Sequence, residues 1–265
     1  MEEKKIPEPV EALVFVLVIF GFVLGVASIL SIWILLSGSS SEPQSRWLLV
    51  LGDIPFLIFP IIYVKIRKYN AGAIFRFKAV PAEVLTVSML LGIALGVVSD
   101  ELDRLIQIFL PAPQWLIEEL QFMQAETSSD WLMLLLGVVL LAAFAEEILF
   151  RGFLQVSLER KGDPTRAVLL TSLTWTMIHM NPWWAIQIFL MGVVIGFLAW
   201  RTNSIVPAII VHGLNNLLSL IFYNIGDQLN WYLIGDHVSV YILIPAAVIV
   251  VWSIRQLTSW YRPLS

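Results

Sequence analysis

Long runs of apolar residues, separated by short polar stretches, make up most of this chain. A helix needs roughly 20 residues to cross the ~30 Å hydrocarbon core of a bilayer, so each long run predicts a membrane-spanning helix. The pattern predicts eight spans, of which the fifth is short: Leu13–Leu36, Trp47–Val64, Ala82–Val98, Trp131–Phe150, Ala167–Met180, Trp184–Trp200, Ile205–Tyr223 and Val240–Ile254. We therefore expect an all-α polytopic membrane protein with about eight transmembrane helices.

The composition supports this class of protein and excludes several kinds of site. Hydrophobic residues make up 58% of the chain and charged residues 14%, whereas about 25% of the residues of soluble domains are charged. The absence of cysteine excludes disulfides, thiolate metal sites and a cysteine nucleophile. No basic stripe points to nucleic acid, so the first partner that we expect is the lipid bilayer.

The basic residues are distributed unevenly between the predicted loops. With the N-terminus in the cytoplasm, fourteen of the 16 lysines and arginines lie in cytoplasmic segments, and only Arg46 and Arg104 lie outside. Cytoplasmic loops of membrane proteins carry an excess of Lys and Arg, so this distribution predicts that both termini are cytoplasmic. The expected location is an integral multi-pass position in a membrane, which is the plasma membrane if the source is a prokaryote.

The longest loop, Asp100–Asp130, would then lie outside the membrane. Its apolar residues recur at helical spacing up to Phe109, which predicts an amphipathic helix at the interface, and a second helix is expected at Gln114–Gln124. We expect a single domain with three parts: residues 1–130 with three spans and this loop, 131–223 with spans four to seven, and 224–265 with an outer loop and the last span.

Polar residues that are costly in hydrocarbon concentrate in the second half of the chain. A charged side chain at the centre of a membrane helix costs about 2.5–3.5 kcal/mol, so such residues face the protein interior and mark functional sites. Glu147 and Arg151 are four residues apart on span four, the spacing of an ion pair that would brace this span. Glu146 is turned about 100° away from Glu147, so it need not share the arginine and can face a different cavity.

Three more polar residues form a constellation with Glu146. His179 ends span five, and His212 and Asn216 are four residues apart on one face of span seven. A glutamate and a histidine can deprotonate a water molecule, while a second histidine and an asparagine amide can donate hydrogen bonds to an oxyanion. This set suits hydrolysis of a carbonyl compound within the membrane, and no G-x-S-x-G motif offers a serine nucleophile instead.

Other polar residues have plainer interpretations. Asn215 is typical of a contact between membrane helices. Asp53, close to Pro55, indicates a helix break at the outer end of span two, and His237 lies in a polar outer loop and is assigned no role.

The constellation resembles the three motifs of the CPBP (Abi) family of intramembrane proteases, which includes the type II CAAX prenyl endopeptidases. The motif EExxxR is matched by Glu146, Glu147 and Arg151, FxxxH by Trp175 and His179, and HxxxN by His212 and Asn216. The resemblance covers roughly Trp131 to Tyr223. Trp175 replaces the usual phenylalanine, and because it keeps an aromatic ring we expect it to alter packing more than chemistry.

The resemblance implies an intramembrane endopeptidase that hydrolyses a membrane-embedded or membrane-anchored peptide or protein near the cytoplasmic side of the bilayer. It implies water activation by Glu146 and His179, oxyanion stabilisation by His212 and Asn216, and structural support from Glu147, Arg151 and Trp175. Family members are often described as metalloproteases, and Glu146, His179 and His212 could hold zinc with water in the fourth position. No HExxH motif settles this question, and we favour a glutamate-dependent mechanism without a bound metal.

The depth of these residues and the class of protein stay open. Counted at 1.5 Å per residue, Glu146 lies ~8 Å, His212 ~13 Å and His179 ~20 Å from the cytoplasmic face, so one plane does not contain all three. A non-enzymatic immunity or scaffold protein would keep the fold without the activity. A proton-coupled transporter could use the carboxylates as a relay, but paired halves are then expected, and the polar residues here lie in one half.

Overall fold

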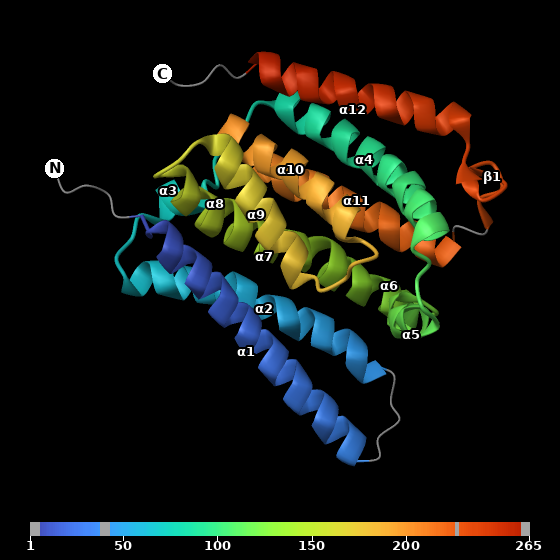
Figure 1. Ribbon diagram of the computed structural model, residues 1–265, viewed down its shortest axis with the longest axis horizontal. Coiled ribbons are helices and arrows are strands. Elements are labelled where there is room, and N and C mark those ends of the chain that lie inside the picture. The colour runs from blue at the N-terminus through green and yellow to red at the C-terminus, as the bar shows by residue number, and fades with distance from the viewer. Residues whose placement is uncertain (1–5, 38–42, 226–227, 261–265) are drawn as a thin grey trace.

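The computed structural model describes residues 6–37, 43–225 and 228–260, and these ranges are almost entirely helical (Figure 1). The predicted all-α fold is confirmed. The elements are α1 Pro9–Leu36, α2 Pro43–Ile66, α3 Ala71–Phe75, α4 Ala82–Phe109, α5 Gln114–Glu119, η1 Leu120–Met123, α6 Ser128–Leu134, η2 Leu135–Leu141, α7 Ala142–Glu147, η3 Ile148–Leu154, α8 Gln155–Glu159, α9 Pro164–Ile178, α10 Ala185–Thr202, α11 Val206–Ile225, β1 Leu233–Ile234, β2 His237–Val238 and α12 Val240–Trp260.

Within the described ranges, six helices are long and apolar enough to cross a bilayer: Pro9–Leu36, Ala82–Phe109, Ser128–Glu159, Ala185–Thr202, Val206–Ile225 and Val240–Ser259. They indicate an integral multi-pass membrane protein. The two other predicted spans correspond to α2, which is not among the six, and to α9, which has 15 residues.

The first turn of α1 and the last turn of α12 lie at the same end of the molecule (Figure 1). The count of eight spans and the cytoplasmic position of both termini stay predictions. Three of the basic residues on which the orientation rests lie outside the described residues: Lys4, Lys5 and Arg262.

Two predicted boundaries are wrong. Span four does not end at Phe150, because α6, η2, α7, η3 and α8 form one continuous helix from Ser128 to Glu159. The amphipathic helix expected in the long outer loop is the end of α4, which runs without a break to Phe109. The second helix expected in this loop, Gln114–Gln124, is present as α5 followed by the 3₁₀ turn η1.

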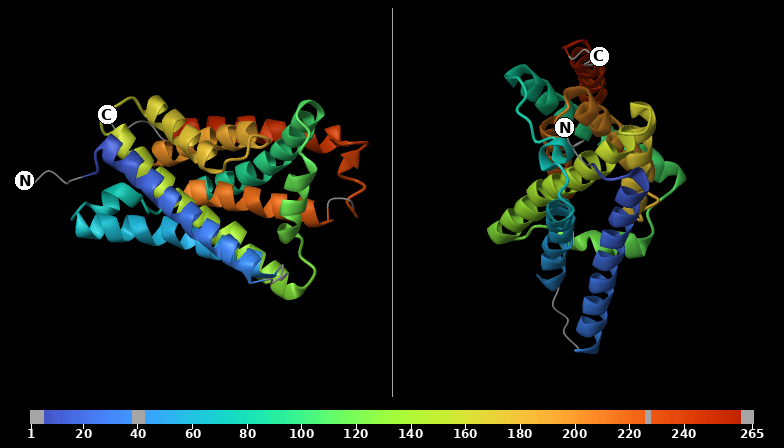
Figure 2. Two further views of the ribbon diagram at one scale, coloured as in Figure 1. Left: turned by 60° about the horizontal axis from the view of Figure 1, so that its bottom comes forward. Right: turned by 90° about the vertical axis from the view of Figure 1, so that its left-hand side faces the viewer.

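Four helix pairings organise the bundle. α4 packs against both α11 and α12, α9 packs against α10, and α2 packs against α7. α4 and α11 approach closely at Gly96, where a Cβ atom would lie 2.5 Å from Leu218 Cδ1. The buried residues of α1, Ala12, Val16 and Ile19, are in its first half, and its second half lies away from the other helices (Figure 2).

A short β-hairpin, β1–β2, precedes α12 and is tied to α4. The Glu101 carboxylate accepts hydrogen bonds from His237 Nδ1 at 2.9 Å and from the Val238 backbone N–H at 2.8 Å. Tyr232 donates from its hydroxyl to Asp100 at 2.9 Å. His237, which was assigned no role from the sequence, therefore helps to hold the hairpin in place.

Candidate active site

The two glutamates lie in the middle of the long helix Ser128–Glu159 and not near its end. Glu146 follows Ser128 by 18 residues and precedes Glu159 by 13, so it lies about 20 Å along the helix from Glu159. His179 follows Pro164 by 15 residues, a distance of about 22 Å along α9. The conflict between the expected depths of Glu146 and His179 disappears because the helix continues nine residues beyond Phe150.

The glutamates are flanked by two π-helical turns. α7 carries both carboxylates and lies between the π-helical segments η2 and η3. π-helical turns are rare in proteins and occur frequently at functional sites. They change the rotation of the residues around the helix axis, so the direction in which each side chain points does not follow from α-helical spacing alone.

Glu147 joins Arg151 and His212 in a fully enclosed cluster. Its Oε1 atom accepts hydrogen bonds from Arg151 Nη1 at 2.9 Å and from His212 Nδ1 at 2.9 Å. The side chains of Glu147 and Arg151 are 0% exposed, and that of His212 is 3% exposed. The predicted ion pair is present, and the bond to His212, which connects the first motif with the third, was not expected from the sequence.

Glu147 Oε1, which accepts from both Arg151 and His212, indicates which ring nitrogen of His212 carries a hydrogen. A guanidinium group only donates hydrogen bonds, and the positive charge of Arg151 at 2.9 Å favours the ionised form of the Glu147 carboxylate. His212 therefore donates its Nδ1–H to Glu147. The opposite ring nitrogen, Nε2, then carries a hydrogen only when the ring is an imidazolium.

Glu146 is linked to the second motif by Trp175. The indole Nε1–H of Trp175 donates a short hydrogen bond of 2.5 Å to Glu146 Oε2. The backbone carbonyl of the same residue accepts a hydrogen bond from His179 Nδ1 at 2.7 Å. A neutral His179 consequently presents an unprotonated Nε2.

The end of α9 leaves His179 at a helix terminus. His179 is the C-cap of α9, and Met180 follows it in the left-handed region with φ 48°. A methionine in this conformation is strained, and such residues cluster at functional sites. Asn181 then begins a turn in which its Oδ1 accepts from the backbone N–H groups of Trp183 and Trp184.

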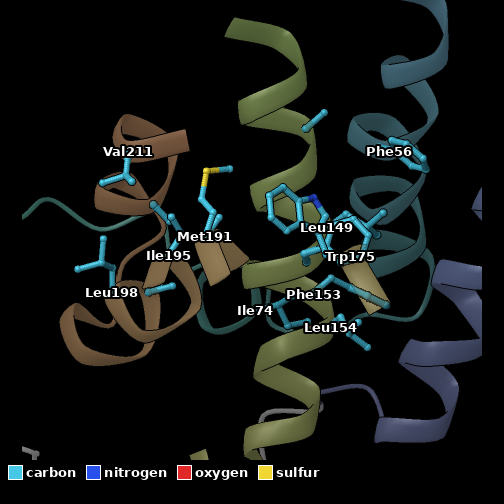
Figure 3. Close-up of a cluster of buried hydrophobic side chains, with 14 of the residues drawn as sticks. Phe56, Ile74, Leu149, Phe153, Leu154, Trp175, Met191, Ile195, Leu198 and Val211 are labelled. Carbon is cyan, nitrogen blue, oxygen red and sulfur yellow. The ribbon is translucent and has the colours of Figure 1, made fainter. Parts of the chain in front are cut away.

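Trp175 is buried in the centre of the cluster, with 1% of its surface exposed. Figure 3 shows it in the buried apolar cluster that contains Leu149 and Phe153. Its ring lies edge-on to the rings of His179 and His212, with centroids 5.1 and 5.3 Å away. The indole fits because α10 has a glycine at position 192, where a Cβ atom would lie 3.1 Å from Trp175 Cε3.

Asn216 lies on the η2 side of the site. Its Nδ2 donates to the carbonyl of Val138 in η2 at 3.0 Å, which leaves the amide a second N–H. Gly213 allows α11 to approach η2 closely, since a Cβ atom there would lie 3.4 Å from the carbonyl oxygen of Val139. The neighbouring Asn215 has a buried Oδ1 atom without a hydrogen-bond partner in the described part of the chain.

Asp53 is a residue of this region that sequence reasoning missed. It lies within α2, so the helix break expected there is absent, and its carboxylate interacts electrostatically with Glu146. The signal in the sequence is an acidic residue inside an apolar run, the same signal that marks the two glutamates.

A metal site is not formed by these residues. Across residues 6–37, 43–225 and 228–260, no three side chains of His, Cys, Asp or Glu are grouped so that they could hold a metal ion. The set Glu146, His179 and His212 does not provide the three ligands of a catalytic zinc site.

Comparison with known proteins identifies the region that carries the site. Residues 128–218 match the family model described as type II CAAX prenyl endopeptidase Rce1-like. This match includes all three motifs and coincides closely with the part of the chain, 131–223, in which they were expected. No curated protein and no solved structure matches the chain. The family supports an intramembrane function of the CAAX-protease type.

Proposed function

Since residues 128–218 match the Rce1-like family model, we propose that this chain is an intramembrane endopeptidase that hydrolyses a peptide bond of a membrane-anchored polypeptide. In this proposal Glu146 and His179 activate water. His212 and Asn216 stabilise the oxyanion that forms on the attacked carbonyl, and Glu147 and Arg151 hold His212.

The observation that carries the proposal is the hydrogen bond between Glu147 and His212. It joins two motifs that are 65 residues apart in the chain, within a cluster of almost completely buried polar groups. Burial of a carboxylate, a guanidinium and an imidazole together is costly in a membrane protein. We infer that a catalytic requirement accounts for this cost.

The proposed reaction proceeds by attack of water. The Glu146 carboxylate takes a proton from a water molecule that also donates to His179 Nε2, and the oxygen attacks the carbonyl carbon of the substrate. The carbonyl oxygen becomes an oxyanion that accepts hydrogen bonds from His212 Nε2–H and from the second N–H of Asn216. Glu146 then passes its proton to the amide nitrogen as the C–N bond breaks, which releases an amine and a carboxylic acid.

The oxyanion role requires the imidazolium form of His212. Because Nδ1–H is bound to Glu147, Nε2 is a donor only in the charged ring. The ionised Glu147 stabilises this charge at a distance of 2.9 Å.

The test uses the purified protein in lipid nanodiscs with two fluorogenic peptides. One carries a prenylated cysteine near its C-terminus, and the other is anchored by a hydrophobic helix. Glu146→Gln should lower kcat by roughly 10²–10⁴-fold, the range for loss of a general base. Glu83→Gln is the matched control, since Glu83 is an exposed residue in the first turn of α4, and should cleave like wild type.

A chelator is added to parallel reactions, and the activity should persist because the site residues form no metal-binding group. Cleavage that survives in Glu146→Gln would contradict the assignment of the base. A wild-type protein that cleaves neither peptide would favour the non-enzymatic alternative.

A further inference from the structure

Trp175 makes contacts that a purely structural aromatic residue would not make. Both its side chain and its backbone bond to the two residues assigned to water activation, Glu146 through the indole N–H and His179 through the carbonyl oxygen. We propose that Trp175 is a positioning residue that orients Glu146 for proton transfer, an inference that rests on the proposed function.

The hydrogen bond from the Trp175 indole restricts the rotamers that the Glu146 side chain can adopt. A glutamate in the middle of a helix has several rotamers, and a general base must be held in the geometry of the proton transfer to be effective. Trp175 occupies Oε2. The other oxygen, Oε1, is thereby assigned to the water molecule.

The indole itself is held rigidly. The guanidinium carbon of Arg151 lies 4.4 Å from the centre of the Trp175 ring, a cation–π contact between two buried side chains. The rings of His179 and His212 make T-shaped contacts with it, with ring centroids 5.1 and 5.3 Å away. The donor atom of Trp175 is therefore fixed in position before any substrate binds.

The hydrogen bond from Trp175 to Glu146 changes the role that the sequence suggested for this tryptophan. An aromatic replacement of phenylalanine was expected to change packing more than chemistry. A phenylalanine ring could keep the contacts with Arg151, His179 and His212, but it has no N–H group with which to reach Glu146. Trp175→Phe therefore removes the proposed function of the residue and little else.

The first measurement is spectroscopic and does not depend on catalysis. The chain has 11 tryptophans, and the ¹⁵N-labelled protein in nanodiscs gives one indole N–H resonance for each. Trp175→Phe identifies the resonance of Trp175 by its absence. Glu146→Gln should shift this resonance upfield, because a charged acceptor is replaced by a neutral one, whereas Glu83→Gln should leave all resonances in place.

The second measurement is kinetic. Trp175→Phe should lower kcat by about tenfold or more, the effect of losing a hydrogen bond to a charged group, while KM stays within about twofold. Trp183→Phe is the matched control, because it removes an indole hydrogen bond of 3.1 Å to the Pro111 carbonyl, away from the glutamate. It should leave both constants unchanged.

The two measurements separate this inference from the proposed function. A Trp175 resonance that does not respond to Glu146→Gln overturns the inference even if the protein cleaves peptides. An unchanged kcat in Trp175→Phe, in an enzyme that depends on Glu146, also overturns it. If wild type cleaves neither peptide, the proposed function fails, and the resonance still decides whether Trp175 bonds to Glu146.

Discussion

Glu147→Gln is predicted to destabilise the protein strongly, although the substitution changes few atoms. A glutamine keeps a carbonyl oxygen that can accept from Arg151 and His212, so the geometry of the cluster is retained. What disappears is the negative charge. Arg151 then remains in the interior with a 0% exposed side chain and without its counter-ion.

The magnitude follows from the surroundings of Arg151. Apart from Glu147, it contacts the Gly192 carbonyl at 3.4 Å and the ring of Trp175 at 4.4 Å, which are both uncharged, and Glu146 adds only a weaker electrostatic attraction. Removing one partner of a buried ion pair costs about 3–5 kcal/mol. At roughly 2–4 °C per kcal/mol for a domain of this size, the midpoint of thermal unfolding should fall by about 6–20 °C.

The assay is thermal unfolding of purified variants in one detergent, with Glu146→Gln as the matched control one residue away. Glu146 is only half-buried, so its loss of charge should lower the free energy of unfolding by about 1 kcal/mol or less. The double variant Glu147→Gln/Arg151→Met, which removes both charges, should recover at least half of the lost stability. Equal midpoints for Glu147→Gln and Glu146→Gln would refute this account of the buried charges.

Two further predictions concern other parts of the fold. Gly192→Ala should destabilise the protein by about 1–3 kcal/mol and reduce kcat, because the new Cβ would lie 3.0 Å from Ser172 Cβ and 3.1 Å from the Trp175 ring. Gly21→Ala is the control, since Gly21 has no neighbour within 4 Å of an added Cβ. Equal stability of the two variants would contradict the packing argument. Glu101→Gln should weaken the tie between α4 and the β-hairpin by about 1–3 kcal/mol, because His237 and Val238 lose a charged acceptor, and unfolding curves should show this loss at unchanged peptidase activity.

The sequence predicted local features of the site well. The positions of the helices follow from the apolar runs, and the Glu147–Arg151 pair follows from a spacing of four residues, which holds although Arg151 is in the π-helical segment η3. These features depend on residues that are close in the chain. Their physical basis is the periodicity of a helix and the thickness of a bilayer.

The end of span four was mispredicted because its last residues are polar. Gln155, Ser157 and Glu159 are polar, yet they lie in the helix, where their side chains make hydrogen bonds inside the protein. Gln155 Nε2 donates to the Gly196 carbonyl at 2.9 Å, and Ser157 donates to the Phe153 carbonyl at 2.7 Å. Hydropathy alone cannot distinguish a polar residue that faces water from one that is paired with a neighbouring helix.

Contacts between helices were the part that the sequence did not reveal. The bonds from Trp175 to Glu146, from His212 to Glu147 and from Asn216 to Val138 each join different helices. They depend on how far each helix is rotated about its axis. Two π-helical turns next to the glutamates change this rotation, and no residue pattern announced them.

In the cluster of buried charges each group depends on the one before it, and this explains the cluster better than a contribution to stability does. An ion pair in the interior is weak evidence for stability, since apolar residues of similar size often serve as well or better. Arg151 is the counter-ion of Glu147 at 0% exposure, and in the proposed mechanism Glu147 is in turn the counter-ion that the imidazolium form of His212 requires. Of these three groups only His212 is proposed to contact the substrate, through its Nε2 atom. On this reasoning the double variant that restores stability should still lack peptidase activity, because His212 has lost the anion that the proposed imidazolium form requires.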